Sequence, residues 1–165
     1  MNIIRILTLA DIITLSNAVC GVLSIVFAIE RSFTTAMLFL ILAVILDGLD
    51  GIVARTTKRG PLGADLDSLA DTISFGVAPV AFGYMQTQTF LAVIAFIFFV
   101  ACGILRLARF NLKESHKYYE GMPITMNGIL IPIVYFVDLP TRFYPIIYIV
   151  LGILMISSFK TKKLF

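Results

Sequence analysis

Charged residues are scarce in this chain: Asp, Glu, Lys and Arg make up 14% of its 165 residues, and only one histidine is present. Soluble domains carry about 25% charged and about 45–50% apolar residues, whereas 59% of this chain is hydrophobic. The two cysteines, Cys20 and Cys102, lie inside apolar stretches and are interpreted as small hydrophobic residues, not as a disulfide or metal pair. The composition therefore excludes an ordinary soluble domain and favours a protein surrounded by lipid.

Long apolar runs take the place of the missing charges. Six runs are separated by short polar stretches, and each is close to the ~20 residues that a membrane-spanning helix requires. They cover approximately residues 12–29, 34–54, 66–85, 89–109, 123–138 and 143–159. The sequence predicts an all-α polytopic membrane protein with six transmembrane helices, forming one domain over residues 1–165. We expect neither a cleavable signal peptide nor a nucleic-acid partner.

The basic residues are distributed unequally between the two sides that this topology defines. Only Arg31 and Arg142 lie on one side, and the other 11 of the 13 lie on the side that carries both termini. Because basic residues are retained in the cytoplasm, we expect a multi-pass cell-membrane protein with both termini cytoplasmic. The residues on that side are Arg5, Arg55, Lys58, Arg59, Arg106, Arg109, Lys113, Lys117, Lys160, Lys162 and Lys163.

Four aspartates flank the short loop between the second and third helices. Asp47 and Asp50 are three residues apart, and Asp67 and Asp71 are four apart, so each pair occupies one helix face. Antiparallel packing of these helices would bring all four carboxylates together. Such a group takes up protons or is neutralised by cations, and oxygen-only ligands favour Mg²⁺, Mn²⁺ or Ca²⁺ over zinc.

Two other interpretations of the acids remain open at this point. They could form surface ion pairs with the neighbouring bases Arg55, Lys58 and Arg59, although two matched stripes of acids make this less favoured. They could also bind a transported cation. Transport sites lie near the membrane midplane, whereas these acids lie near helix ends, which disfavours transport.

The acids belong to a longer pattern. The run Asp47-Gly-Leu-Asp50-Gly51-Ile-Val-Ala54-Arg55, a spacer, and the run Gly63-Ala-Asp-Leu-Asp67-Ser-Leu-Ala-Asp71 resemble the motif of the CDP-alcohol phosphotransferase family. That motif reads D-x-x-D-G-x-x-A-R, then G-x-x-x-D-x-x-x-D, and the spacer here is one residue shorter than is usual. Enzymes of this family displace CMP from a CDP-linked lipid and join the lipid phosphate to an alcohol.

The resemblance implies six helices, a homodimer and two bound Mg²⁺ or Mn²⁺ ions. It implies that Asp47, Asp50, Asp67 and Asp71 hold the metals and that Asp71 is also the general base. Asn17, at helical depth, could contact the cytidine or satisfy a neighbouring helix. The predicted CDP-binding set is Asn17, Asp50, Gly51, Ala54, Arg55, Gly63 and Asp67.

Further runs are similar to the phosphatidylserine synthase branch of the family. This resemblance implies CDP-diacylglycerol and L-serine as substrates, or an ether-lipid donor if the source is archaeal. Glycerol 3-phosphate and inositol phosphate remain alternative acceptors, and a cation transporter is the alternative outside the family. The runs are Thr14-Leu-Ser-Asn17, Ser68–Pro79, Arg106-Leu-Ala-Arg109-Phe-Asn111 and Glu120-Gly121-Met122-Pro123.

Arg106 and Arg109 lie one helical turn apart at the expected cytoplasmic end of the fourth helix. Guanidinium groups bind a phosphate or a carboxylate through forked hydrogen bonds, so both arginines, with Asn111, are predicted to bind the acceptor or a phosphate. The alternative is that the arginines only extend to lipid headgroups.

Overall fold

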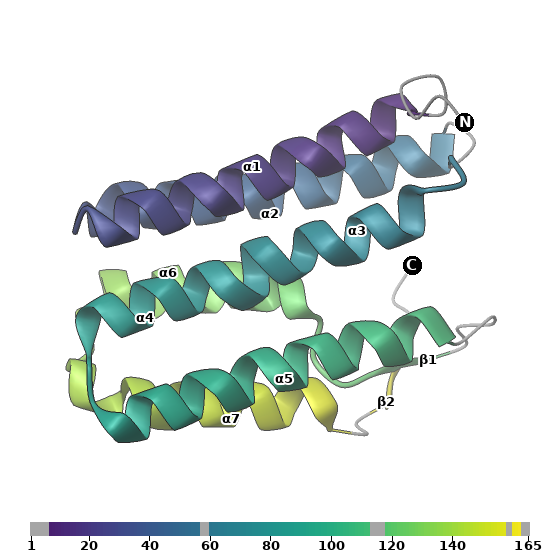
Figure 1. Ribbon diagram of the computed structural model, residues 1–165. Coiled ribbons are helices and arrows are strands. Elements are labelled where there is room, and N and C mark those ends of the chain that lie inside the picture. The colour runs from purple at the N-terminus through teal and green to yellow at the C-terminus, as the bar shows by residue number, and fades with distance from the viewer. Residues whose placement is uncertain (1–6, 57–59, 113–117, 158–159, 163–165) are drawn as a thin grey trace.

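The computed structural model describes residues 7–56, 60–112, 118–157 and 160–162. They form a bundle of helices whose axes are roughly aligned (Figure 1). All six predicted apolar segments are helical, with bounds that differ by a few residues, so the helical prediction is confirmed. The elements are α1 (Leu9–Ile29), α2 (Phe33–Thr56), α3 (Gly63–Asp71), a π-helical segment (Thr72–Val77), α4 (Ala78–Gln86), α5 (Phe90–Leu112), β1 (Tyr118–Glu120), a 3₁₀ turn (Ile124–Met126), α6 (Asn127–Phe136), a second 3₁₀ turn (Thr141–Phe143), α7 (Tyr144–Ile156) and β2 (Lys160–Lys162).

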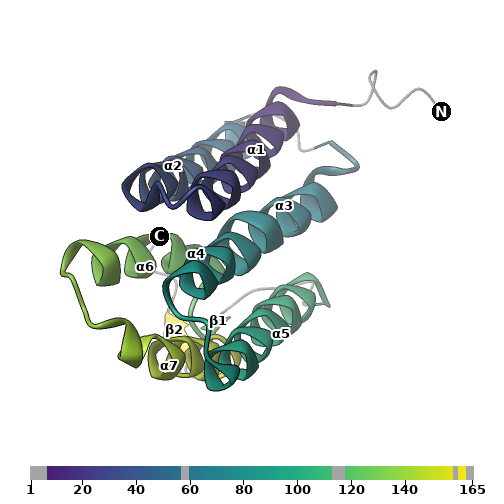
Figure 2. The same ribbon diagram turned by 60° about the vertical axis from the view of Figure 1, so that its left-hand side comes forward.

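The helices form three layers, which are clearest in Figure 2. The α1–α2 hairpin lies on one side, α3 and α4 form a continuous rod with α6 beside it in the middle, and α5 and α7 pack together on the other side. The end of α2, the start of α3 and the end of α5 lie at the same end of the bundle in Figure 1. This arrangement brings the acids of α2 and α3 to the same end as the arginines of α5.

A capping box fixes the start of α1. The Thr8 backbone N–H donates to Asp11 Oδ2 at 2.8 Å, and the Asp11 N–H donates to Thr8 Oγ1 at 3.3 Å. These bonds satisfy backbone donors that the first turn of a helix leaves without partners. The helix therefore begins at Leu9, somewhat before the predicted apolar run, and carries Thr14 and Asn17 toward α2 and the middle layer.

The π-helical segment directly follows Asp71. Its widened turn is seen in the Ala78 N–H, which bonds to the Ile73 carbonyl five residues earlier. Pro79 has no N–H to offer the Phe75 carbonyl four residues before it, and Asn127 Nδ2 of α6 donates to that carbonyl at 3.4 Å. An amide from another helix thus donates to a carbonyl beside the proline, and it ties α6 to this segment.

Helix α1 approaches the same segment very closely. A β-carbon on Gly21 would overlap Ser74, so only glycine allows this approach without movement. The Ser74 hydroxyl donates to the Asn17 carbonyl at 3.0 Å. The segment that follows Asp71 is therefore held between α1 and α6.

The exterior of the bundle is apolar. Three helices, α1, α2 and α5, are individually long and apolar enough to cross a membrane, while α6 and α7 with their 3₁₀ turns are shorter. Large apolar side chains point outward on each long helix, for example Val19, Leu38 and Ile97. Soluble monomers rarely expose so much apolar surface, and this agrees with a membrane protein.

One feature of the fold was not predicted, and one prediction falls largely on residues that the structure does not describe. The antiparallel pair of β1 and β2 was not predicted, because its first strand lies in the polar stretch expected to be a loop. The orientation in the membrane stays a prediction. Of the basic residues on which it rests, Arg5, Lys58, Arg59, Lys113, Lys117 and Lys163 lie outside the described residues.

Candidate metal and substrate site

The acidic residues come from two helices that meet at one end of the bundle. Asp47 and Asp50 lie in the second half of α2, and Asp67 and Asp71 lie on α3, which begins at the buried Gly63. Spacings of three and four residues place each pair on one side of its helix. Asp47 and the pair on α3 face the same region between α2 and α3.

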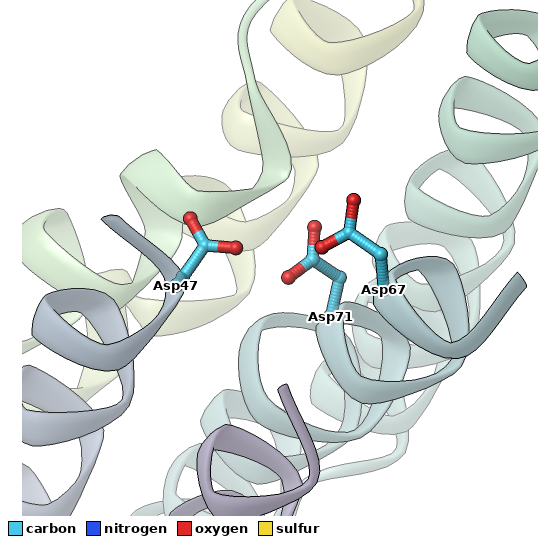
Figure 3. A group of neighbouring side chains, drawn as sticks. All are labelled: Asp47, Asp67 and Asp71. Carbon is cyan, nitrogen blue, oxygen red and sulfur yellow. The ribbon is translucent and has the colours of Figure 1, made fainter. Parts of the chain in front are cut away.

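Three of the carboxylates lie close together (Figure 3). Asp47 faces Asp67 and Asp71 across the gap between α2 and α3, and one oxygen from each residue lies within 4.8 Å of the others. Two full negative charges about 5 Å apart repel by roughly 3 kcal/mol at an effective dielectric constant near 20. Three such charges in a partly buried site require cations or protons to neutralise them.

The chemistry of these groups fits a divalent metal ion. Carboxylate oxygens are hard ligands of the kind that Mg²⁺ and Mn²⁺ prefer. Asp71 is buried, and its Oδ1 atom has no hydrogen-bond partner within the described part of the chain. Buried polar atoms normally have a partner, so an orphaned carboxylate oxygen beside two other acids fits a metal ligand.

Asp50 differs from the other three acids. It is 3% exposed, and its Oδ2 atom accepts a hydrogen bond of 2.6 Å from the Thr14 hydroxyl of α1. Asp50 is thus turned toward α1, and it borders the acid cluster without being one of the three clustered carboxylates. The prediction that all four aspartates gather is met for three, and the buried Thr14 partner explains the position of the fourth.

A cavity of about 320 Å³ opens beside the acids. One further wall is formed by α5, and the segment that precedes α6 completes the lining. Arg106 contributes a positive charge to the α5 wall, and its guanidinium carbon lies 5.5 Å from the centre of the Phe110 ring. The cavity is therefore lined by an arginine as well as by the aspartates. The lining residues are Asp47, Asp50, Gly51, Asp67, Ser68, Asp71, Arg106, Leu107, Phe110, Pro123 and Thr125.

The second predicted arginine lies elsewhere. Arg109 donates from Nη1 to the Ile156 carbonyl and from Nη2 to the Met155 carbonyl, each at 3.3 Å, at the C-terminal end of α7. It is not among the described residues that line the cavity. Asn111 also lies just outside, where its Nδ2 atom donates to the hydroxyl of the lining residue Ser68 at 2.9 Å.

Of the remaining predicted substrate residues in the described structure, Gly51 lines the cavity and the others do not. Ala54 is half-buried and Arg55 is exposed farther along α2. Asn17 is fully buried, and neither polar atom of its side chain has a hydrogen-bond partner in the described structure. The proposed ion pairs of the acids with Lys58 and Arg59 fall on residues outside the described ranges.

Sequence reasoning missed two polar residues of the site. Thr14 is the donor to Asp50, and Thr125 is one of the residues that line the cavity. Each is a polar residue within or next to an apolar run, and Thr14 lies three residues before Asn17 on the same helix face. That spacing was a usable signal for Thr14, whereas Thr125 lies before α6 in a turn whose direction the sequence does not determine.

Comparison with known proteins identifies the family of the chain. Residues 7–159 match the family described as CDP-alcohol phosphatidyltransferase. The chain belongs to this family. Its membership confirms the resemblance predicted from the aspartate motif, and identifies the chain as a membrane-associated transferase of phospholipid biosynthesis.

Individual relatives narrow the comparison further. The CDP-diacylglycerol–serine O-phosphatidyltransferase of Methanocaldococcus jannaschii is 39% identical over 165 residues, covering 98% of this chain and 77% of the relative. The archaetidylserine synthase of Methanothermobacter thermautotrophicus is 39% identical over 163 residues, covering 92% and 68%. The CDP-diacylglycerol–serine O-phosphatidyltransferase of Bacillus subtilis is 35% identical over 129 residues, covering 75% and 73%.

Proposed function

We propose that this chain transfers the phosphatidyl group of CDP-diacylglycerol, or of its ether-lipid equivalent, to the hydroxyl group of L-serine and releases CMP. The observation that carries the proposal is the cluster of Asp47, Asp67 and Asp71 within the family motif. The names of the relatives, which include both a serine phosphatidyltransferase and an archaetidylserine synthase, support serine as the acceptor.

The reaction exchanges one bond to phosphorus for another. The serine oxygen forms a bond to the lipid-side phosphorus, and the bond from that phosphorus to the oxygen leading to CMP breaks. The serine hydroxyl loses its proton, and CMP leaves with the electron pair of the broken bond. The protein has to position the hydroxyl, accept its proton and tolerate the charge of the pyrophosphate.

We propose that Asp47, Asp50, Asp67 and Asp71 hold two divalent ions, Mg²⁺ or Mn²⁺. When bound, such ions neutralise the pyrophosphate and stabilise the charge that develops on the departing CMP. The cluster of three carboxylates and the orphaned Asp71 oxygen support this assignment. Asp50, held by Thr14 at the edge of the cluster, completes the set.

Asp71 is our candidate for the general base. It is the most buried of the three clustered acids, and its free oxygen has no protein donor competing for it within the described structure. Proton removal by a placed carboxylate typically contributes about 10²–10⁴-fold to a rate. This role suits a weak nucleophile such as the serine hydroxyl.

The α5 wall supplies the complementary charge. Arg106 lines the same cavity as the acids and is our candidate to bind the serine carboxylate or a phosphate oxygen. The acidic wall with Gly51 is proposed to receive the CDP group, with Asn17, Ala54, Arg55 and Gly63 around it. The apolar exterior of the helices suits the lipid chains of the donor.

The test is CMP release by purified protein in lipid nanodiscs. CDP-diacylglycerol and its ether-linked analogue are each combined with Mn²⁺ or Mg²⁺ and with L-serine, glycerol 3-phosphate or inositol phosphate. We expect CMP release that depends on serine and metal. Release only with a phosphate-bearing acceptor would reject serine, and cation flux without any CMP release would support the transporter alternative.

We further propose one membrane domain with six crossings, both termini in the cytoplasm and a homodimeric assembly in the cell membrane. Helices α1, α2 and α5 are each long enough to cross, and the rod of α3, the π-helical segment and α4 runs beside them (Figure 1). The excess of basic residues on one side supports the orientation.

A further inference from the structure

The segment between β1 and α6 is attached to the C-terminal end of α7. Gly121 has a φ angle of +76°, and a β-carbon there would overlap the Met155 carbonyl and come within 2.9 Å of the Ser157 carbonyl. The Met122 N–H donates to the Leu154 carbonyl at 3.0 Å. Glycine is required here both by the backbone angle and by the approach of α7.

Arg109 of α5 completes this attachment. Besides the Met155 and Ile156 carbonyls, its Nη2 atom reaches the Ser157 carbonyl at 3.5 Å, and it lies 3.0 Å from where a β-carbon on Gly121 would be. The last carbonyls of a helix have no donors within the helix, and a cation near them interacts favourably with the helix dipole. Arg109, Gly121 and the end of α7 thus form one contact, which we call the α7 latch.

The same segment is anchored again a few residues later. Ile124 is buried, and its side chain lies 2.9 Å from where a β-carbon on Gly103 of α5 would be. Asn127 donates to the Phe75 carbonyl of the π-helical segment. Between these anchors lie Pro123 and Thr125, which form part of the cavity wall.

We propose that Arg109 is a positioning residue that fixes the Pro123–Thr125 wall of the cavity through the α7 latch, and is not itself a ligand of the acceptor. The proposal rests on the proposed function, because its readout is the use of serine. None of the described residues of α7 lines the cavity, and under this proposal α7 still contributes to the reaction. The β1–β2 pair connects the same two parts of the chain.

The latch predicts which substrate is affected when Arg109 is lost. Pro123–Thr125 lines the same cavity as the acids, but the acids stand on α2 and α3, so a displaced Pro123–Thr125 wall alters acceptor placement and leaves the helices that carry the acids in place. A misplacement of about 1 Å can cost on the order of 100-fold in rate. We expect Arg109→Met to lower kcat/KM for serine by roughly 10- to 100-fold while the KM for the CDP-lipid and Mn²⁺ binding to the free protein stay unchanged.

Gly121→Ala distinguishes the α7 latch from direct binding of serine by Arg109. Gly121 has no side chain to bind serine, and a β-carbon there would disturb only the contact with the end of α7 and with Arg109. We expect this substitution to reproduce the loss seen with Arg109→Met. The double variant should lose no more than the worse single variant, since both break one contact. If Arg109 instead binds the acceptor, the two losses will multiply, and this result would overturn the proposal.

Hydrogen exchange gives a readout that does not depend on activity. The Met122 amide should exchange faster in Arg109→Met and be partly protected again in Arg109→Lys, because an ammonium group can still donate to one or two carbonyls. The amides of α1 and α2 should remain protected, which shows that the fold is intact. An unchanged exchange rate of the Met122 amide in Arg109→Met would refute the latch. This measurement remains decisive even if the Gly121→Ala variant does not fold.

Two matched controls keep the comparison specific. Arg142→Met makes the same chemical change at an exposed arginine that precedes α7, and Gly48→Ala adds a β-carbon where no described atom outside its own stretch of helix lies within 4 Å. Both should match the unaltered protein. Failure of the unaltered protein to release CMP with any acceptor would reject the proposed function, whereas normal activity with an unaffected Arg109→Met variant would reject only the latch.

Discussion

Replacing Thr14 by valine removes one hydroxyl group and nearly no volume from the contact between α1 and α2. The Thr14 hydroxyl has one proton and two nearby acceptors, the Ala10 carbonyl at 3.0 Å and Asp50 Oδ2 at 2.6 Å. The proton goes to the carboxylate, because the shorter bond to a charged acceptor is the stronger one. In the valine variant, Asp50 keeps its buried position and loses this donor.

The expected effect is large because Asp50 is almost fully buried at 3% exposure. A hydrogen bond to a charged group contributes about 1.5–3 kcal/mol, which corresponds to roughly 10- to 100-fold in an equilibrium constant. Without the donor, the carboxylate is less well oriented and is more easily protonated, and both changes oppose a cation beside it. Loss of an outer partner of a metal ligand typically costs about 10- to 100-fold in metal affinity.

The assay is titration of Mn²⁺ into the free protein, followed by electron paramagnetic resonance, together with turnover at increasing Mn²⁺. Thr14→Ser keeps the donor and should behave like the unaltered protein. Ser16→Ala removes a hydroxyl from the same helix that, among the described residues, bonds only to the Ile12 carbonyl, and it should also be silent. Unaltered Mn²⁺ affinity in Thr14→Val, or equal losses in Thr14→Val and Thr14→Ser, would refute the reasoning.

Three further predictions concern the acids and the membrane. Removing divalent metal with EDTA should abolish CMP release and added Mn²⁺ or Mg²⁺ should restore it; full activity in metal-free buffer would contradict the metal assignment. Asp71→Asn should lower kcat by at least about 10²-fold at saturating Mn²⁺, and recovery of normal kcat there would leave Asp71 as a ligand only. A cysteine at the exposed Pro61, with Cys20 and Cys102 replaced, should react with an impermeant reagent only in opened cells, and ready labelling of intact cells would reverse the proposed orientation.

Much of the acid cluster could be predicted because it depends on helical spacing alone. Asp67 and Asp71 are one turn apart on α3, and Asp47 comes within reach of them because α2 and α3 both pack against α1. Asp50 could not be placed in the same way. Three residues along a helix rotate a side chain by about 60° from its starting direction, and this was enough to turn Asp50 toward Thr14 on α1.

The Pro123–Thr125 part of the cavity wall was less predictable, because it is not formed by a regular helix face. Pro123 and Thr125 lie in and beside a 3₁₀ turn, and their position depends on distant anchors such as the Phe75 carbonyl. The sequence does not indicate that Asn127, 52 residues farther along the chain, donates to that carbonyl.

The two arginines of α5 illustrate the same limit most directly. Arg106 and Arg109 are one turn apart at the same helix end, and by residue type and spacing they are equivalent candidates for an anion. The two side chains point in different directions from the helix and therefore contact different neighbours. Arg106 meets the acidic cavity, and Arg109 meets the last carbonyls of α7, which have no donors in their own helix. A guanidinium group satisfies either partner equally well, so its function here is decided by which acceptors the packing of α5 against α7 brings within reach.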